Sequence, residues 1–204
     1  ADGIASVVTL NARLRHQDGG RIHGLIDHGS HIHARQQDLL GIGKARTQID
    51  GARGRGAVLV AAAGNAGTNA GGYAPGNCTG VITTGATGID GKRAAYSNHG
   101  AVVDISAPGS AIATTSNTGT QGPDAPATAD ADGTSIAAAH VSAAAARYRS
   151  TSTGSTPDQV TEYLTGKAVR AFPGDTCDDT LTTSCGTGIL TLAQPSTNVT
   201  VTYF

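Results

Sequence analysis

The fold is decided by residues 57–65, AVLVAAAGN, an apolar run that ends at a glycine and an asparagine. Short apolar runs of this kind are typical of strands that are buried on both faces of a parallel sheet. Residues 80–86, GVITTGA, and residues 101–109, AVVDISAPG, have the same character, and the latter stops at Pro-Gly. Residues 44–55 carry apolar side chains at helical spacing and are followed by Gly56, which predicts a surface helix that ends there.

Two further helices are predicted downstream. Ser135–Arg149 is rich in alanine, and Pro157–Leu164 begins with proline at the first helical position, after Thr156 as N-cap. Strands that alternate with helices predict an α/β fold, with a mostly parallel sheet and helices on both faces. The length of 204 residues favours a single domain over residues 1–204.

The composition excludes several functions. Only 14% of the residues are charged and the net charge is -1, so a basic nucleic-acid-binding surface is not expected. No run of 18 apolar residues occurs, so no membrane-spanning helix is expected either. Because the sequence contains no methionine, we expect a processed or partial chain from which any signal peptide has been removed.

The three cysteines favour an oxidising compartment. Cys177 and Cys185 lie in a loop rich in glycine, aspartate and threonine, where they can close a short disulfide, and Cys78 is then left over. We therefore expect a secreted, extracellular protein.

Residues 133–141, GTSIAAAHV, carry the most chemical information, because a serine stands where a glycine turn becomes a helix. A serine hydroxyl is a poor nucleophile unless its surroundings activate it. A helix N-terminus offers free N–H groups and a positive dipole end, which suit an oxyanion beside the attacking oxygen. Taken alone, Ser135 is better explained as a helix N-cap than as a nucleophile.

Several blocks together resemble the subtilisin-like serine proteases, or subtilases, in the order that this family shows. Residues 133–141 resemble the family's Gly-Thr-Ser-Met-Ala-x-Pro-His-Val, with Ile136 and Ala139 in place of methionine and proline. The other matching blocks are residues 60–65 (the strand that ends in the oxyanion-hole asparagine), 96–100 (Ser-Asn-Tyr-Gly), 104–109 (Asp-Ile-x-Ala-Pro-Gly), and 171–173 with 185–188 (the tail of proteinase K-related secreted enzymes).

The resemblance implies a three-layer subtilisin-like fold that lacks its N-terminal part, and a serine endopeptidase that acts on protein or peptide substrates. Ser135 would be the nucleophile, and its N–H together with the Asn65 amide would hold the oxyanion. Residues 62–64 (Ala62, Ala63 and Gly64) would form one wall of the substrate pocket. Leu40 and Gly41 would stand in the family's Ser-Leu-Gly-Gly substrate-binding segment.

The resemblance also implies roles for His140 and for a calcium ion. Five residues along a helix rotate His140 about 140° away from Ser135, so it matches the family's structural histidine rather than the catalytic base. In the proteinase K branch, two carbonyls and an aspartate bind calcium, and the register gives Thr79, Val81 and Asp104. Hard oxygen ligands suit calcium, although Asp104 is also suited to accept hydrogen bonds at a strand end.

The triad acid and base are less easily placed. Ile26–His31 offers Asp27 as the acid and His28 as the base, but the two family patterns that it resembles overlap there. The 37 residues between His28 and Asn65 are also fewer than the family shows. In another alignment, residues 2–14 resemble the family's Val-Arg-Val-Leu strand. The chain then begins after the triad histidine, and a separate N-terminal segment supplies both residues.

Three other interpretations remain. His23, His28, His31 and His33 can ligate a transition metal, although no cysteine or carboxylate pattern completes a zinc motif. The chain can be a catalytically incomplete subtilase-like fragment or a module that binds peptides or proteins. It can also be an unrelated α/β protein in which Asn65 and Ser135 lie far apart. We favour the endopeptidase.

Overall fold

A computed structural model of the chain describes residues 7–10, 39–119, 122, 124–173, 177 and 184–192. Its centre is a sheet in which five parallel strands are followed by one antiparallel strand at the edge. In spatial order the strands are β1 (Val7–Leu10), β2 (Val58–Ala62), β3 (Ile82–Thr87), β4 (Ile105–Pro108), β8 (Ile189–Leu190) and β7 (Val169–Arg170). The mostly parallel α/β sheet predicted from the apolar runs is confirmed.

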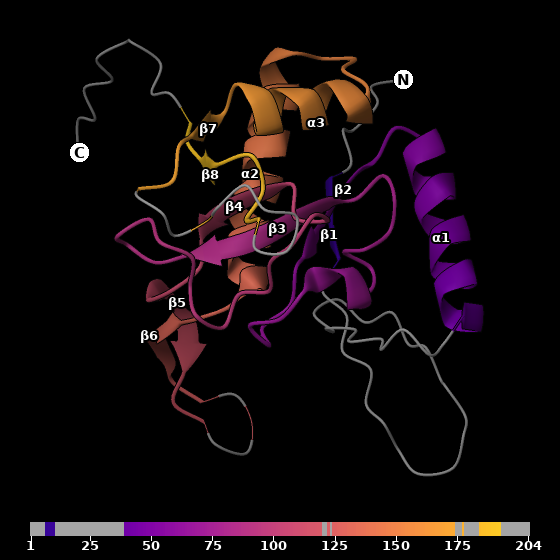
Figure 1. Ribbon diagram of the computed structural model, residues 1–204. Helices are drawn as coiled ribbons and strands as arrows, with labels where there is room; N and C mark the ends of the chain where they lie inside the picture. The colour runs from indigo at the N-terminus through magenta and orange to yellow at the C-terminus, as the bar shows by residue number, and fades with distance from the viewer. Residues whose placement is uncertain are drawn as a thin grey trace, which may run out of the picture.

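Helices cover both faces of this sheet (Figure 1). They are α1 (Leu39–Gly54), α2 (Thr134–Thr151) and α3 (Pro157–Gly166), and a short 3-10 helix covers Ala70–Gly72. Successive side chains of a strand point to opposite faces. Val58 and Val60 accordingly pack with α2 and α3, whereas Leu59 and Ala61 pack with Ile49 of α1. The three-layer arrangement therefore follows from the continuous apolar run of β2.

The helix boundaries agree with the sequence at most ends. Thr156 caps α3 with a complete capping box: its side chain accepts from the Gln159 N–H, and the Gln159 side chain accepts from the Thr156 N–H. Helix α1, in contrast, begins at Leu39 rather than Lys44. None of the helices in the described part of the chain has the length and hydropathy needed to span a bilayer.

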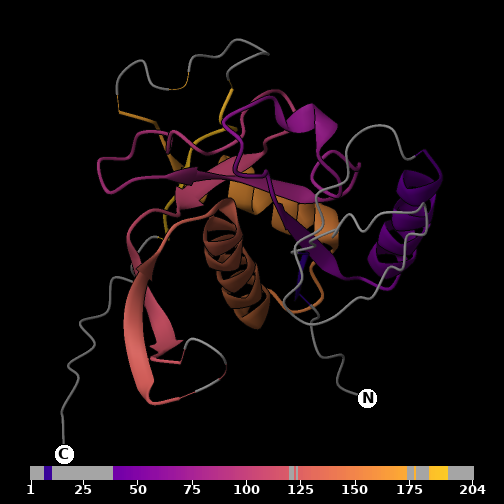
Figure 2. The same cartoon turned by 90° about the horizontal axis from the view of Figure 1, so that it is seen from below.

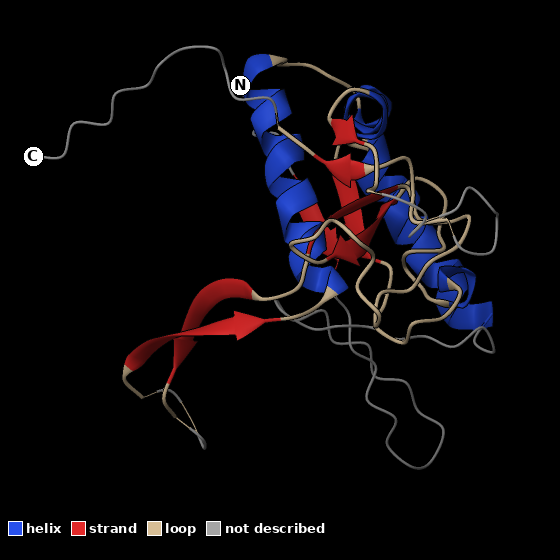
Figure 3. Ribbon diagram, turned by 60° about the vertical axis from the view of Figure 1, so that its left-hand side comes forward, coloured by secondary structure: helices blue, strands red, loops and turns tan. Residues whose placement is uncertain are grey.

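A hairpin that the sequence did not predict leaves the body of the molecule just before α2. It consists of β5 (Ile112–Asn117) and β6 (Pro126–Ala131), paired from Ile112–Ala131 to Asn117–Pro126. Figures 2 and 3 show it projecting away from the sheet. Most of its residues are exposed, and most are alanines, threonines, serines or aspartates, so the sequence shows no apolar alternation that would predict these strands.

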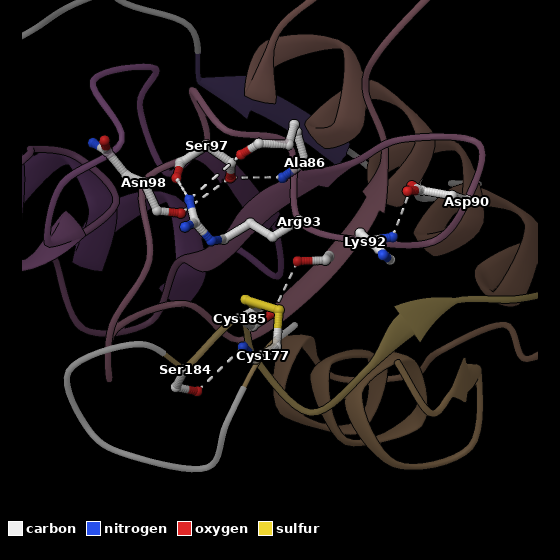
Figure 4. Close-up of a disulfide and its surroundings, with 12 residues drawn as sticks. Ala86, Asp90, Lys92, Arg93, Ser97, Asn98, Cys177, Ser184 and Cys185 are labelled. Carbon is white, nitrogen blue, oxygen red and sulfur yellow. Dashed lines mark hydrogen bonds between the residues drawn. A yellow bond between two sulfur atoms is a disulfide. The ribbon is translucent and has the colours of Figure 1, made fainter. Parts of the chain in front are cut away.

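The cysteines take the arrangement expected from the sequence. Cys177 and Cys185 form a disulfide (Figure 4). Cys78 is free and buried. The carbonyl of Cys185 accepts a hydrogen bond from Ser106 Oγ of β4 at 2.9 Å, which attaches the disulfide to the central sheet.

Candidate active site

The first half of the site is the loop that follows β2. Asn98, whose side chain is only 1% exposed, holds this loop from inside. Its Nδ2 donates to the Ala63 carbonyl at 2.9 Å, and its Oδ1 accepts from the N–H groups of Ala66 and Thr68 at 3.0 and 3.1 Å. The loop is therefore fixed around Asn65, which itself is exposed.

The position that follows β2 and precedes Asn65 requires a glycine, Gly64. Its φ of +104° lies in the region that favours glycine, and a Cβ there would lie 2.3 Å from Asn98 Nδ2. Any side chain at position 64 would displace Asn98 and so the loop.

The second half of the site is the N-terminus of α2. The N-cap residue is Gly133, so Ser135 is the second residue inside the helix and not its cap. Within the described residues, neither the Ser135 N–H nor the Ser135 Oγ has a hydrogen-bond partner. Both groups are therefore available to a substrate.

Asn65 and Thr134 join the two halves. Asn65 Oδ1 accepts from the Thr134 N–H at 2.9 Å and from the Thr134 hydroxyl at 2.8 Å. The same hydroxyl accepts from the Gly64 N–H at 3.2 Å. Because the amide oxygen accepts both bonds, Asn65 Nδ2 takes part in neither of them and keeps its two N–H groups for other partners.

The two halves converge on one small volume. A Cβ on Gly133 would lie 3.1 Å from Ser135 Oγ and 3.6 Å from Asn65 Nδ2. Two N–H donors and a hydroxyl thus surround the space that only a glycine at position 133 leaves open. This is the arrangement required to attack a carbonyl carbon and to stabilise the negative charge that develops on its oxygen. The hypothesis that Asn65 and Ser135 lie far apart is wrong.

The sequence analysis named Asn65 and Ser135 but missed the residues that hold them, Thr134 and Asn98. Thr134 lies inside the quoted motif, but its burial was not evident from the sequence. Asn98 is separated from Asn65 by 33 positions, and only the strand β3 that folds between them brings the two together.

The predicted substrate-binding residues of the first segment, residues 62–64, differ in how far they are buried. Ala62 is half-buried at the end of β2. Ala63 is fully buried against Ala70 and Val103, so its methyl group faces the interior and only its backbone can face a substrate. The buried Gly64 offers backbone alone.

Leu40 and Gly41, which were matched to the family's substrate-binding segment, lie in a helix, and their part in binding a substrate stays a prediction. They form the first turn of α1, which packs on the face of the sheet opposite to α2. The helix extends N-terminally beyond its recognisable apolar spacing, and that extension takes up both residues. The parallel neighbour of β2 on this side is β1, with Leu10 paired to Ala61.

Of the histidines named in the sequence analysis, only His140 lies among the described residues. His140 Nδ1 lies 3.0 Å from the Ile136 carbonyl of its own helix, so this ring is engaged with the backbone, as a structural residue would be. Asp27 and His28, the candidate triad acid and base, lie outside the described residues, as do His23, His31 and His33.

The predicted calcium ligands share one end of β3 and β4. Asp104 Oδ2 accepts from the Thr83 N–H at 2.7 Å. Burial raises the pKa of the Asp104 carboxyl above its usual value, and this hydrogen bond opposes part of the rise. A hard cation beside Asp104 would relieve the cost of burying its charge, so the oxygen donors fit calcium.

Two arginines of α1 add positive charge nearby. Arg53 Nη1 donates to the Gly80 carbonyl at 2.8 Å, and Arg46 Nη2 donates to Thr79 Oγ1 at 3.3 Å. Within the residues that the structure describes, no group of three or more His, Cys, Asp or Glu side chains is placed to hold a metal. Any calcium would therefore depend on backbone carbonyls and a single carboxylate.

A cavity of about 420 Å³ lies at the opposite end of α2 from Ser135. Its lining includes Tyr148, Ser155 and Tyr163, and neither Asn65 nor Ser135 takes part. This cavity is not the substrate pocket.

Comparison with known proteins agrees with this geometry. Residues 28–188 match the model of the subtilase family, Peptidase_S8. The chain is 36% identical over 176 residues to an extracellular protease of Xanthomonas campestris pv. campestris, across 84% of this chain and 30% of that protein. It is 38% identical over 118 residues to an extracellular serine proteinase of a Thermus species, across 58% of this chain and 28% of the relative.

Solved structures give the same result. A protease of Pseudoalteromonas arctica superposes with a TM-score of 0.67 at 38% identity, covering 72% of this chain and 44% of its own. A cold-adapted subtilisin-like serine proteinase superposes with a TM-score of 0.60 at 30% identity, covering 72% of this chain and 50% of its own. The chain thus spans about a third of those two curated relatives and about half of these solved chains. With a family match over most of its length, a matching fold and a serine and asparagine brought together at a helix N-terminus, the chain belongs to the subtilase family.

Proposed function

We propose that this chain carries the nucleophile and the oxyanion hole of a secreted serine endopeptidase. The observation that supports this function best is the convergence of Ser135 Oγ and Asn65 Nδ2 on one point beside a free helix N–H. All described strands except those of the β5–β6 hairpin belong to one sheet. This supports the proposal that residues 1–204 belong to a single, incomplete catalytic domain.

The chemistry follows from these groups. Ser135 Oγ attacks the carbonyl carbon of the scissile peptide bond while an imidazole takes its proton. The Ser135 N–H and Asn65 Nδ2 donate hydrogen bonds to the resulting oxyanion. The imidazole then protonates the departing amine, and water hydrolyses the acyl-enzyme to release the second product and regenerate Ser135.

The imidazole and its carboxylate have two candidate sources. Asp27 and His28 belong to this chain, whereas the alternative is a separate N-terminal segment, which we favour. Within the described residues, β1 has no neighbouring strand on its outer side, and the unpaired N–H and C=O groups of such an edge can pair with a further strand. A segment that extends the sheet at β1 would reach the edge where β2 leads to Asn65.

The test is the intact mass of the purified protein after exposure to a fluorophosphonate. We expect one adduct, which is lost in Ser135→Ala and retained in Ser142→Ala, a serine on the same helix that donates to the Ala138 carbonyl. Retention of the adduct in His28→Ala, together with a second polypeptide in the sample, would support the separate segment. Folded protein that forms no adduct would contradict an activated Ser135 and leave the peptide-binding alternative.

We further propose secretion and protein or peptide substrates. The disulfide suits an oxidising compartment, and the relatives named above are called extracellular. Recovery of a reduced, unlinked Cys177 from the native host would contradict this location.

Subtilases commonly bind structural calcium, and we propose that Thr79, Val81 and Asp104 hold one such ion here. The buried carboxylate supports this site, whereas the two nearby arginines should weaken the affinity. Calcium added to EDTA-treated protein should raise the melting temperature by mass action, and Asp104→Asn should remove that response. Asp124→Asn, on the distant hairpin, is the matched control; an equal response in all three proteins would exclude this site.

A further inference from the structure

We infer that Tyr96 is a positioning residue for the nucleophile, acting through its hydroxyl group on the backbone of Gly133. The inference deepens the proposed function, since it concerns how Ser135 is held. Tyr96 is half-buried and packs against the main core, and its hydroxyl meets the turn that precedes α2.

The hydroxyl bonds to two segments, Gly109–Ser110 and Gly133. It donates to the Gly109 carbonyl at 2.6 Å, accepts from the Gly133 N–H at 3.0 Å, and lies 3.0 Å from Ser110 Oγ. A tyrosine hydroxyl has one proton and two lone pairs. Because the carbonyl of Gly109 can only accept and the N–H of Gly133 can only donate, the Ser110 hydroxyl must donate the third bond. The Tyr96 hydroxyl is therefore fully used, and the directions of its bonds are fixed.

Tyr96 itself is anchored on β3. Ser97 Oγ accepts from the Ala86 N–H at 2.9 Å, and Arg93 Nη1 donates to the Ser97 carbonyl at 2.8 Å (Figure 4). The Ala94 N–H also donates to the Ala86 carbonyl at 2.9 Å. The hydroxyl is thus held at a fixed place relative to the central sheet.

The Tyr96 hydroxyl lies at the neck of the β5–β6 hairpin, by which we mean the two places where the hairpin joins the body of the molecule. The chain leaves the body at Gly109–Ser110 and returns at Asp132–Gly133. The Gly133 N–H is shared between two acceptors, the Tyr96 hydroxyl at 3.0 Å and the Gly109 carbonyl at 2.8 Å, and the Ala111 N–H donates to Asp132 Oδ1 at 2.7 Å. A hairpin without packing on either face is marginally stable in water. Its movements would therefore displace the turn at Gly133 unless hydrogen bonds hold the neck together.

The consequence falls on Ser135, two residues beyond Gly133. Small displacements of a reacting group reduce rates strongly. The Tyr96 hydroxyl touches no reacting atom; it keeps the turn, and with it Ser135 Oγ, in register with Asn65 Nδ2. The sequence shows Tyr96 only as part of a matching block, and its partners become visible only in three dimensions.

The test compares Tyr96→Phe with Tyr148→Phe. Tyr148 is a control because its hydroxyl has no partner within the described residues and its ring stacks on Tyr163 far from the site. We expect Tyr96→Phe to lower the second-order rate of fluorophosphonate labelling about tenfold, the size that one hydrogen bond contributes. The pH dependence of labelling should not change, because the hydroxyl takes no proton in the reaction. A rate equal to that of the wild type would overturn the inference.

A second readout separates this inference from the proposed function. If the wild-type protein forms no adduct, the proposed function fails, but the tie between Tyr96 and the turn is still measurable by amide hydrogen exchange. Tyr96→Phe should then raise the exchange rates of the Gly133 and Thr134 amides about tenfold, while Tyr148→Phe leaves them unchanged. Equal exchange in the two variants would overturn the inference independently of any activity.

Discussion

The loop after β2 and the turn before α2 meet at the same site but are held in different ways. The loop over residues 63–68 is held by the buried side chain of Asn98 and by the Asn98 N–H, which donates to the Gly64 carbonyl at 2.9 Å. The turn over residues 133–135 is held by bonds to other segments: the buried Thr134 hydroxyl bonds to Gly64 and Asn65, and the Gly133 N–H donates to the Gly109 carbonyl. It is tied by Tyr96 from one side and by Asn65 from the other.

The difference indicates that the turn depends on the loop more than the loop depends on the turn. Asn65 stabilises the turn through Thr134, whereas the loop has four hydrogen bonds to Asn98 and only one of its backbone groups, the Gly64 N–H, bonds to the turn. Damage to the loop should therefore disturb the turn as well, while damage to the turn should leave the loop in place. Asn65 has two tasks: its amide oxygen holds α2, and its amide nitrogen remains free for a substrate.

The largest effect should come from Asn98→Ala. The substitution leaves one carbonyl and two N–H groups of the loop without partners, which should reduce the free energy of unfolding by about 4 kcal/mol. Chemical denaturation followed by circular dichroism measures this. Asn69→Ala is the matched control, because Asn69 is exposed and caps a single N–H, that of Gly71, at 2.8 Å.

The control should lose only about 1 kcal/mol, which is typical of a lost cap. Similar losses in the two variants would contradict the role given to Asn98, since it would then be an ordinary loop residue. A loss of labelling in Asn98→Ala at temperatures where the protein is still folded would show that the loop also positions the site.

A smaller and more local effect should come from Thr134→Val. The substitution keeps the shape of the side chain but removes the hydroxyl between Gly64 and Asn65, so the Asn65 amide is held by the Thr134 N–H alone. We expect labelling by a fluorophosphonate to slow about tenfold and the free energy of unfolding to fall by about 1 kcal/mol.

Thr165→Val serves as the control for Thr134→Val, because the Thr165 hydroxyl donates to the Thr161 carbonyl within α3 at 2.9 Å. The NMR signals of the Ala66 and Thr68 amides should remain unchanged in Thr134→Val. If they shift as in Asn98→Ala, the loop depends on the turn and the proposed dependence is reversed.

The sequence predicted the parts of the fold in which local preference and burial agree. The runs at residues 57–65 and 101–109 became strands because continuous apolar stretches are stable only where both faces are covered. The N-terminus of α3 was placed correctly, since Thr156 and Pro157 satisfy the helix end with local contacts. The β5–β6 hairpin was not predicted because its exposed residues carry no periodic pattern.

The same distinction applies to the candidate site. Ser135 and Asn65 were recognisable because each lies in a block with its own residue pattern. The role of Leu40 and Gly41 stays a prediction, and the sequence did not indicate that α1 continues through them. Asn98 and Tyr96 were not recognised as supports because a side chain's partners across tens of residues leave no local trace.

By itself, the sequence determined which segments are buried strands, where α3 begins, and which serine stands at the start of a helix. Each of these follows from interactions among residues that are near neighbours in the chain. Only the tertiary structure decided that Asn65 faces Ser135, that Asn98 and Tyr96 hold the two segments, and that α1 lies on the other face of the sheet. Those outcomes depend on contacts between distant segments, which form only when the parallel strands take their order and the core closes around them.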